Sequence, residues 1–229
     1  MALRPVETPC ATEDALPAIL AQLEEDIVFG YLLPRERLVE DNLMKRFQAK
    51  RHVVRHALAE LQRMGLVERS PNKGAAVRDL SPTDAEQLYA VREILETAAA
   101  SQIELGNPAV IAALSAIQER HDAAIAAADI KAAFRINIEF HRKFFAACGN
   151  PHLAGAIEHY GQQTHGIRSL SITRTEYLRS AGEEHWAMIE CLRRGDRARL
   201  VGLCRTHISH SKVAYIEAYR ARLPAGAVA

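Results

Sequence analysis

The spacing of apolar residues in the first 80 positions follows a helical repeat and then a strand-like one. Between residues 14 and 29, apolar side chains recur three and four positions apart, and Gly30 follows as a helix stop. Gly65 is placed to cap a later helix. The predicted elements are helices at residues 14–29, 40–47 and 51–64, a turn at 32–38, and strands at 66–69 and 75–78 joined by a turn at 71–74. This order predicts a winged helix-turn-helix with a small β-hairpin.

From residue 80 to about residue 220 the apolar pattern is helical, with no strand-like alternation. Ser81, Pro82 and Asp84 predict a helix start, because serine caps the first turn, proline suits its first position and an acid favours its positive end. Further breaks are predicted at Gly106-Asn107-Pro108, Asp129, Gly149-Asn150-Pro151, Ser180 (with Glu183 as a capping box) and Gly195-Asp196. These breaks predict about six helices, or seven with another break near Gly166, in an all-α helical bundle.

The expected fold class is therefore mainly α, with two domains of different architecture. A length of 229 residues is enough for each of two small domains to bury a core. The expected division is a flexible leader at residues 1–12, the winged helix-turn-helix at 13–79, the all-helical domain at 80–222 and a tail at 223–229.

The composition is that of an ordinary globular protein. Hydrophobic residues make up 48% and charged residues 25% of the chain, and the formal net charge is only +1. No apolar run approaches the roughly 18 residues that a membrane span needs, and the first residues lack the apolar core of a signal peptide. The four cysteines have no CxxC spacing, which is typical of free thiols in a reducing compartment. We therefore expect a cytoplasmic protein with no membrane partner.

Residues 45–58 depart from this charge balance, because they include five lysines or arginines and no acid. On a helix that begins at Arg51, Arg55 lies one turn further along the same face, and His52 and His56 repeat the pattern beside them. The opposite face is apolar and consists of Val54, Ala57, Leu58, Leu61 and Met64. One face of this helix is thus suited to burial and the other to contact with an anion.

Double-stranded DNA is an anion that fits such a helix, because a helix enters the major groove and arginine pairs there with guanine. The candidate DNA-binding residues are Lys50, Arg51, His52, Arg55 and His56 on the helix, and Lys73 and Gly74 at the tip of the hairpin. The alternative is a solvated basic face on an unrelated small domain. The order of the helices and the hairpin favours DNA binding.

Three segments here read LVEDNL at residues 38–43, KRHVVRHAL at 50–58 and LQRMGLV at 61–67. They resemble the DNA-binding domain of the GntR family of transcriptional regulators. The resemblance places Arg51 and Arg55 on the family's two DNA-contacting arginines and Gly74 on its wing glycine. It implies a homodimer that binds a pseudo-palindromic operator. The departures from the family pattern, which bear on the operator sequence, are Arg35 and Gln48 for glycines, Lys50 for serine, Val53 for proline and His56 for glutamate.

Eight of the ten histidines lie beyond residue 120. Asn137 and His141 are four positions apart and so share one face of a predicted helix, while His185 and His207 lie in two later helices. One oxygen ligand and three imidazoles suit zinc, with nickel, manganese or iron as alternatives. A single histidine is more often a surface or hydrogen-bonded residue than a ligand, and His210, one turn from His207, competes for the same role.

Two motifs accompany these histidines: R-x-x-L-E at residues 92–96, and NIEFH at 137–141 followed by GNP at 149–151. With His185 and His207 they resemble the FCD ligand-binding domain of the FadR subfamily within the GntR family. The resemblance extends from residue 81 to residue 219. It implies a bound metal and a small carboxylate effector that completes the coordination of the metal.

Two residues of these motifs, Asn137 and Arg92, bear on how the metal and the carboxylate would be held. Asn137 stands where the subfamily more usually has aspartate, and a neutral carboxamide is a weaker ligand for a dication. Arg92 matches an arginine whose guanidinium is suited to hold a carboxylate in a fork. Its alternative role is an ion pair with Glu96, four residues further along the same helix.

The sequence thus predicts a metabolite-responsive DNA-binding regulator, expected to be a repressor and not an enzyme. Three histidines with an open coordination position also describe catalytic zinc, but the HExxH motif is absent. Glu139, two residues before His141, points to a different part of the helix. A further alternative is a regulator in which the metal is structural or absent and the pocket accepts a larger acyl ligand.

Overall fold

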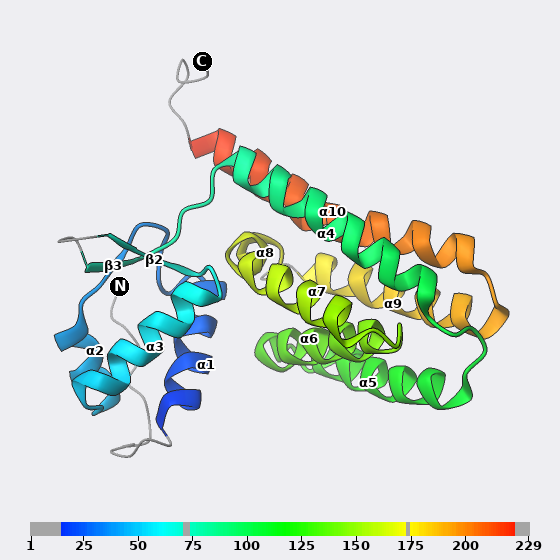
Figure 1. The fold of residues 1–229 in the computed structure, drawn as a ribbon, viewed down its shortest axis with the longest axis horizontal. Coiled ribbons are helices and arrows are strands. Elements are labelled where there is room, and N and C mark those ends of the chain that lie inside the picture. The colour runs from blue at the N-terminus through cyan, green and yellow to red at the C-terminus, as the bar shows by residue number, and fades with distance from the viewer. Residues whose placement is uncertain (1–14, 71–73, 173–174, 223–229) are drawn as a thin grey trace. The chain divides into compact units, whose positions relative to one another are not determined.

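The structure is a computed structural model that describes residues 15–70, 74–172 and 175–222. It divides into two compact units, Met1–Leu80 and Ser81–Ala229 (Figure 1). Both units are largely helical, and the strands of the described residues all belong to the first unit. The mainly α fold class is confirmed. The leader predicted at residues 1–12 and the tail predicted at 223–229 lie outside the described residues.

The described part of the N-terminal unit contains three helices and three short strands. The helices are α1 (Ala15–Val28), α2 (Glu40–Phe47) and α3 (Arg51–Arg63), and the strands are β1 (Arg37–Leu38), β2 (Val67–Ser70) and β3 (Gly74–Val77). The predicted helices, and the two strands of the predicted hairpin, are all present with ends that agree to within one residue.

Strand β1 corrects the prediction of a simple turn at residues 32–38. It pairs antiparallel with β3, which also pairs antiparallel with β2, so the sheet order is β1-β3-β2. Arg37 lies opposite Ala76, and Val67 lies opposite Val77. A strand of two residues is too short to show an alternating pattern, which is why the sequence did not reveal it. The wing is a three-stranded sheet instead of an isolated hairpin.

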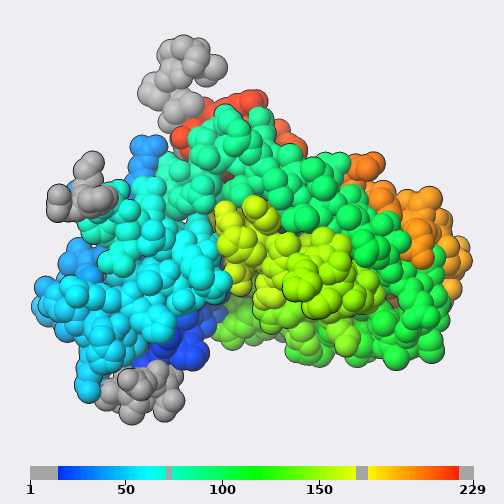
Figure 2. Space-filling view, in the orientation of Figure 1, coloured from blue at the N-terminus to red at the C-terminus, as the bar shows by residue number. Residues whose placement is uncertain are grey.

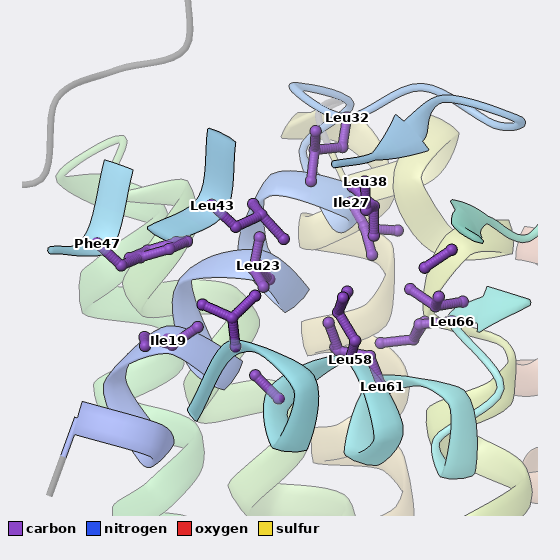
Figure 3. Close-up of a cluster of buried hydrophobic side chains, with 14 of the residues drawn as sticks. Ile19, Leu23, Ile27, Leu32, Leu38, Leu43, Phe47, Leu58, Leu61 and Leu66 are labelled. Carbon is purple, nitrogen blue, oxygen red and sulfur yellow. The ribbon is translucent and has the colours of Figure 1, made fainter. Parts of the chain in front are cut away.

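The apolar face of α3 lies at the centre of the N-terminal core. Its predicted residues are all buried, namely Val54, Ala57, Leu58, Leu61 and Met64. They belong to one cluster with side chains from α1, α2 and the strands (Figure 3). Full burial of one leucine side chain stabilises the fold by about 1.5–3 kcal/mol. The core therefore fixes the rotation of α3 about its axis, so that positions 51, 52, 55 and 56 face solvent.

The turn between α2 and α3 is formed without the glycine that is usual there. Gln48, which ends α2, has φ 48° and ψ 37°, in the left-handed region. Arg35, the other position where glycine is usual, has φ 67°. A left-handed conformation costs a residue with a side chain roughly 1–2 kcal/mol. The backbone shape is thus retained at both positions in spite of the substituted residues.

Arg46 belongs to the basic stretch at residues 45–58, but its side chain points into the N-terminal unit and not to the exposed face of α3. Its guanidinium lies 2.5 Å from the carboxylate of Asp26 on α1, and both side chains are buried. Gln22 also donates a hydrogen bond of 3.0 Å to Asp26. Arg46 therefore joins α2 to α1 inside the unit and does not add to the exposed charge of α3.

The C-terminal unit consists of seven helices within its described residues. They are α4 (Pro82–Gln102), α5 (Pro108–Ala126), α6 (Ile130–Ala146), α7 (Pro151–Gln163), α8 (His165–Ile172), α9 (Thr175–Arg194) and α10 (Arg197–Arg222). Several predicted breaks carry the expected caps. Ser81 and Asp84 form a reciprocal capping box, and Asn107, Asp129 and Asn150 each accept hydrogen bonds from the first turn of the next helix.

Two of the predicted breaks need correction or adjustment. The break at Ser180 is wrong, because α9 continues through it from Thr175 to Arg194. A serine can lie within a helix, and here the continuous helix keeps both Leu178 and His185 buried. The optional break near Gly166 is present slightly earlier, at Thr164, between α7 and α8.

The helices of this unit pack around an apolar core. Helices α4 and α10 lie side by side, and α5 packs against α6 and α9 (Figure 1). In Figure 2 the yellow-green residues of α7 cover part of the near face of the unit, beside α4. The largest fully buried core side chains include Phe140, Phe144, Ile189 and Leu192. No helix of the described residues is long and apolar enough to cross a membrane.

Candidate functional site

The five predicted DNA-binding residues at the start of α3 are all exposed. They are Lys50, Arg51, His52, Arg55 and His56. Lys50 is the N-cap of α3, with extended backbone angles, so its side chain lies at the positive end of the helix. Gly74 begins β3 with φ +77°, a conformation that residues with side chains rarely adopt. Lys73 lies outside the described residues.

Acidic residues of α2 hold the two arginines of this face. Arg51 Nη2 lies 2.7 Å from a carboxylate oxygen of Asp41, and Arg51 Nη1 lies 3.6 Å from Glu40. Arg55 Nε donates to both oxygens of Glu40, at 3.0 and 3.1 Å. The arginine side chains remain about half exposed, at 51% and 57%. Exposed ion pairs are worth at most about 1 kcal/mol, so both guanidinium groups can exchange these acids for another anion.

In the C-terminal unit, three histidines from three helices meet. They are His141 of α6, His185 of α9 and His207 of α10. One ring nitrogen from each lies within 4.8 Å of the other two, and the three ring centroids are 5.0 Å apart in every pair. Within the described residues, this is the one group of at least three His, Cys, Asp or Glu side chains close enough to hold a metal ion.

A hydrogen-bond network fixes which nitrogen of His185 is free to bind a metal. Gln118 Nε2 donates to Oδ1 of Asp122 at 2.7 Å, because a carboxylate can only accept. Gln118 Oε1 therefore faces Nδ1 of His185, at 2.8 Å, and accepts its proton. Trp186 Nε1 donates to the other oxygen of Asp122 at 2.8 Å. The second nitrogen of His185, Nε2, consequently carries a lone pair, and it is buried with no hydrogen-bond partner among the described residues.

His207 is oriented in a similar way by an acid. Its Nδ1 donates to Oε2 of Glu184 at 2.6 Å, and its Nε2 lies 3.2 Å from Nε2 of His141. The predicted competitor His210 instead lies with its Nδ1 3.5 Å from the other oxygen of Glu184. The structure thus brings His207 into the three-histidine cluster and leaves His210 beside it.

The environment favours the neutral form of His141 and of His185. The pKa of His141 and that of His185 both lie well below the ordinary value, mainly because of burial and then because of the neighbouring imidazoles. The guanidinium of Arg168 lowers both further. Neutral imidazoles are the form that binds a metal. Together with His207, His141 and His185 offer three imidazole donors, and the Nε2 atom of His185 is buried without a hydrogen-bond partner among the described residues. This donor set fits zinc or a similar divalent transition metal.

A cavity of about 90 Å³ adjoins the cluster. Its lining includes His141, His207 and also Asn137, which is half-buried. Glu139 points elsewhere: its carboxylate lies 2.8 Å from Arg120 and is 45% exposed. The neighbouring Asn137 therefore shares the cavity with the histidines, whereas Glu139 does not line it.

Two arginines also line this cavity. Arg92 has Nε and Nη2 2.8 Å from Oε1 of Glu96, and its Nη1 donates to Thr164 at 3.0 Å. Arg92 thus both lines the cavity and makes the ion pair considered as its alternative role. Burial opposes its charge, but Glu96 and Tyr89 raise the pKa of Arg92 above its ordinary value. The other arginine, Arg168 of α8, was not predicted, because no spacing in the sequence connects it to the histidines.

Comparison with known families gives two matches in this chain. Residues 17–77 match the family described as bacterial regulatory proteins, gntR family, and residues 87–210 match the FCD domain. The first match covers the helix-turn-helix and the wing, and the second covers all three histidines and every cavity-lining residue except Ser211.

Individual proteins agree with these matches. The chain is 24% identical over 191 residues to the HTH-type transcriptional regulator YdhC of Bacillus subtilis, covering 82% of this chain and 85% of YdhC. It is 28% identical over 208 residues to the HTH-type transcriptional regulator BphR of Paraburkholderia xenovorans, covering 86% of this chain and 83% of BphR. Among solved structures, a GntR transcriptional regulator from Rhodococcus sp. RHA1 aligns with a TM-score of 0.73 at 19% identity, over 90% of this chain and all of that chain. E. coli McbR/YncC aligns with a TM-score of 0.71 at 19% identity, over 93% and 100%.

Proposed function

The chain belongs to the GntR family of bacterial regulatory proteins with an FCD domain, and from this premise we propose a ligand-responsive repressor that senses a small carboxylate beside a metal ion. Membership in the family makes the chain a DNA-binding transcriptional regulator and not an enzyme. What we propose beyond this is the repressor role, the contact residues, the metal, the effector, a homodimeric assembly and a cytoplasmic location.

For the DNA interface, we propose that α3 enters the major groove of a pseudo-palindromic operator. Arg51 and Arg55 are the proposed base or phosphate contacts, because both are exposed on one face and held only by surface ion pairs. Lys50, His52 and His56 flank them and would contact phosphates, and Lys73 and Gly74 would approach the DNA backbone from the wing. A homodimer presents two such helices to two half-sites.

For the sensor, the observation that supports a metal is the buried Nε2 of His185, which has no hydrogen-bond partner among the described residues. A buried polar atom left without a partner costs about 1–3 kcal/mol, and a metal ion would remove that cost. We propose that His141, His185 and His207 hold the ion, with Asn137 supplying an oxygen. Zinc is the first candidate, with nickel, manganese and iron as alternatives. The ion would supply two positive charges and a coordination position for a carboxylate oxygen.

The size of the cavity supports a small effector. At about 30 Å³ for each water in the liquid, about 90 Å³ corresponds to roughly three water molecules. A short organic acid fits this space better than a long acyl chain, the larger ligand considered from the sequence. Arg92 lines the cavity and is the proposed contact for the carboxylate. The effector changes DNA affinity only if it binds the two arrangements of the protein differently.

Metal analysis of the purified protein tests the sensor. We expect about one equivalent of metal per chain, because the three imidazoles lie close enough to form a single site. His141→Ala should lose the metal, whereas His152→Ala, at an exposed position on α7, should retain it. Full metal occupancy in His141→Ala would count against the site. A gel-shift titration with and without chelator and organic acids then measures whether the ligands release the operator.

A further inference from the structure

One amide on α5 lies between two buried imidazoles. The side chain of Gln118 accepts a hydrogen bond from Nδ1 of His185 at 2.8 Å through its Oε1 atom. Its Nε2 atom donates to Oδ1 of Asp122 at 2.7 Å and lies 3.3 Å from Nδ1 of His121. An amide nitrogen carries two hydrogens and cannot accept, so Nδ1 of His121 accepts the second one. The oxygen and both hydrogens of the Gln118 amide are then used.

The same amide therefore gives the two imidazoles opposite tautomers. His185 carries its proton on Nδ1 and presents a lone pair at Nε2. Because its Nδ1 accepts, His121 is neutral and carries its proton on Nε2. Both Nε2 atoms are buried without a hydrogen-bond partner among the described residues, and the two ring centroids are 5.7 Å apart. The amide thus prepares His185, but not the neighbouring His121, to bind a metal.

This arrangement depends on a residue of α9 that has no side chain. Gly182 is buried within α9, and a Cβ atom there would lie 3.1 Å from Nε2 of Gln118 and 3.2 Å from Oδ1 of Asp122. It would also lie 3.7 Å from Nδ1 of His121. The first two distances are shorter than an ordinary van der Waals contact. Glycine is unfavourable inside a helix, and the close approach of these α5 side chains gives a reason for it here.

We propose that Gly182 is a positioning residue of the metal site, because the space it leaves lets Gln118 hold His185 in the metal-binding tautomer and His121 in the opposite one. The inference rests on the proposed function, since the metal is the ligand for which His185 is prepared. A side chain at position 182 would push the amide away from Asp122, and the amide could then turn. Nε2 of His185 would carry the proton in part of the molecules, and a protonated nitrogen does not bind a metal.

Nitrogen-15 chemical shifts of the imidazoles in the metal-free protein test the tautomers themselves. In the unaltered protein we expect the proton on Nδ1 of His185 and on Nε2 of His121. In Gly182→Ala we expect a mixture of tautomers at His185. Zinc affinity, measured by competition with a chelator, should fall roughly 10-fold, as for other residues that orient a metal ligand. Alanine favours a helix more than glycine does, so a weaker α9 would not explain the loss.

Gly202→Ala is the matched control. Gly202 lies within α10, which also supplies a histidine of the cluster, and a Cβ atom there would meet nothing within 4 Å. This variant should keep both tautomers and a zinc affinity within about twofold of the unaltered protein, as expected where an added methyl group contacts nothing. Gln118→Met keeps the approximate length of the side chain but removes the amide. It should give mixed tautomers at both His121 and His185.

Each outcome has a distinct meaning. A single unchanged tautomer of His185 in Gly182→Ala, or a zinc affinity equal to that of Gly202→Ala, overturns the role of Gly182 and leaves the metal sensor standing. The same tautomer at His121 and His185 in the unaltered protein overturns the shared amide. Should Gly182→Ala fail to fold, Gln118→Met decides the question, and fixed tautomers in that variant overturn the inference. Failure of the unaltered protein to bind zinc contradicts the proposed function itself.

Discussion

Arg55 on α3 and His185 on α9 are both polar side chains on amphipathic helices, but the first is 57% exposed and the second is fully buried. Arg55 is held by the acid Glu40 across a solvated surface, where an ion pair is weak and easily exchanged. His185 is held by the neutral amide of Gln118 inside the bundle, where its hydrogen bond fixes one tautomer. The difference shows two ways of preparing a binding group. A surface cation stays free to change partners, and a buried ligand is fixed in advance.

Arg46 is an exception to this difference between the two units, because it is a cation of the N-terminal unit whose side chain is buried. Asp26→Ala should destabilise the N-terminal unit by about 3–5 kcal/mol, because it leaves the buried charge of Arg46 without its partner. Hydrogen exchange of the α3 amides, followed by mass spectrometry, measures the stability of this unit alone.

Glu60→Ala is the control for that experiment, since it removes the partner of Arg63 in an exposed pair on α3 and should change stability by less than about 1 kcal/mol. Similar effects of the two substitutions would mean that the Asp26–Arg46 pair is solvated in solution.

The proposed role of the exposed cations is tested by substituting the arginines of α3 that face solvent. Arg51→Ala or Arg55→Ala should lose about 1–3 kcal/mol of operator binding if the residue contacts a base in two places. Arg63→Ala, an exposed arginine on the last turn of the same helix, is the matched control. A gel-shift titration at fixed salt, on an operator selected from random DNA, provides the measurement. Unchanged affinity in both variants would remove Arg51 and Arg55 from the DNA interface.

The proposal that hydrogen bonds fix the tautomer of buried His185 is tested at Asp122, which does not contact the three-histidine cluster. Asp122→Asn should weaken zinc binding roughly 10- to 100-fold, because the amide of Gln118 could then turn and release the tautomer of His185. Nitrogen-15 chemical shifts of the imidazoles in the metal-free protein report that tautomer directly. Glu119→Gln, at an exposed position on the same helix, is the control. A single unchanged tautomer in Asp122→Asn would contradict the proposed relay.

A smaller effect is expected at the turn between α2 and α3. Gln48→Gly should stabilise the N-terminal unit by roughly 0.5–1 kcal/mol, because glycine adopts the left-handed conformation at Gln48 without steric cost. Gln48→Ala changes the side chain without this freedom and should bring no gain. Chemical denaturation of the three proteins compares them. A loss of stability in Gln48→Gly would show that the side chain of Gln48 makes a contact in solution.

Sequence patterns predicted the structure best where it depends on residues close together along the chain. The exposed and buried faces of α3 follow from residues within one helix, and the caps at Asn107 and Asn150 follow from local hydrogen bonds. The false break at Ser180 arose because the same local pattern can occur inside a helix whose burial is decided elsewhere. The two-residue strand β1 depends on pairing with β3, which no local pattern reveals.

The candidate sensor was predictable only in part for the same reason. The three histidines were candidates from their positions in three predicted helices and from a family resemblance, and the structure brings them together. Gln118 and Arg168 belong to α5 and α8, and only packing places one behind His185 and the other in the cavity wall. The inward position of Arg46 was likewise hidden, since a charged residue at the edge of a basic run is ordinarily solvated.

Glu40 gives the surface site a further property. Its carboxylate lies against Arg51 and Arg55 where a phosphate could otherwise bind, so the chain carries an internal competitor for its own basic face. An isolated phosphate ion must displace a tethered acid and gains little by doing so. A DNA duplex presents many phosphates and base edges at once and can meet that cost at several points together. Because exposed ion pairs are weak, the acid on α2 lowers the affinity of this face for a single anion only by a small factor, which many simultaneous contacts with a polyanion would offset.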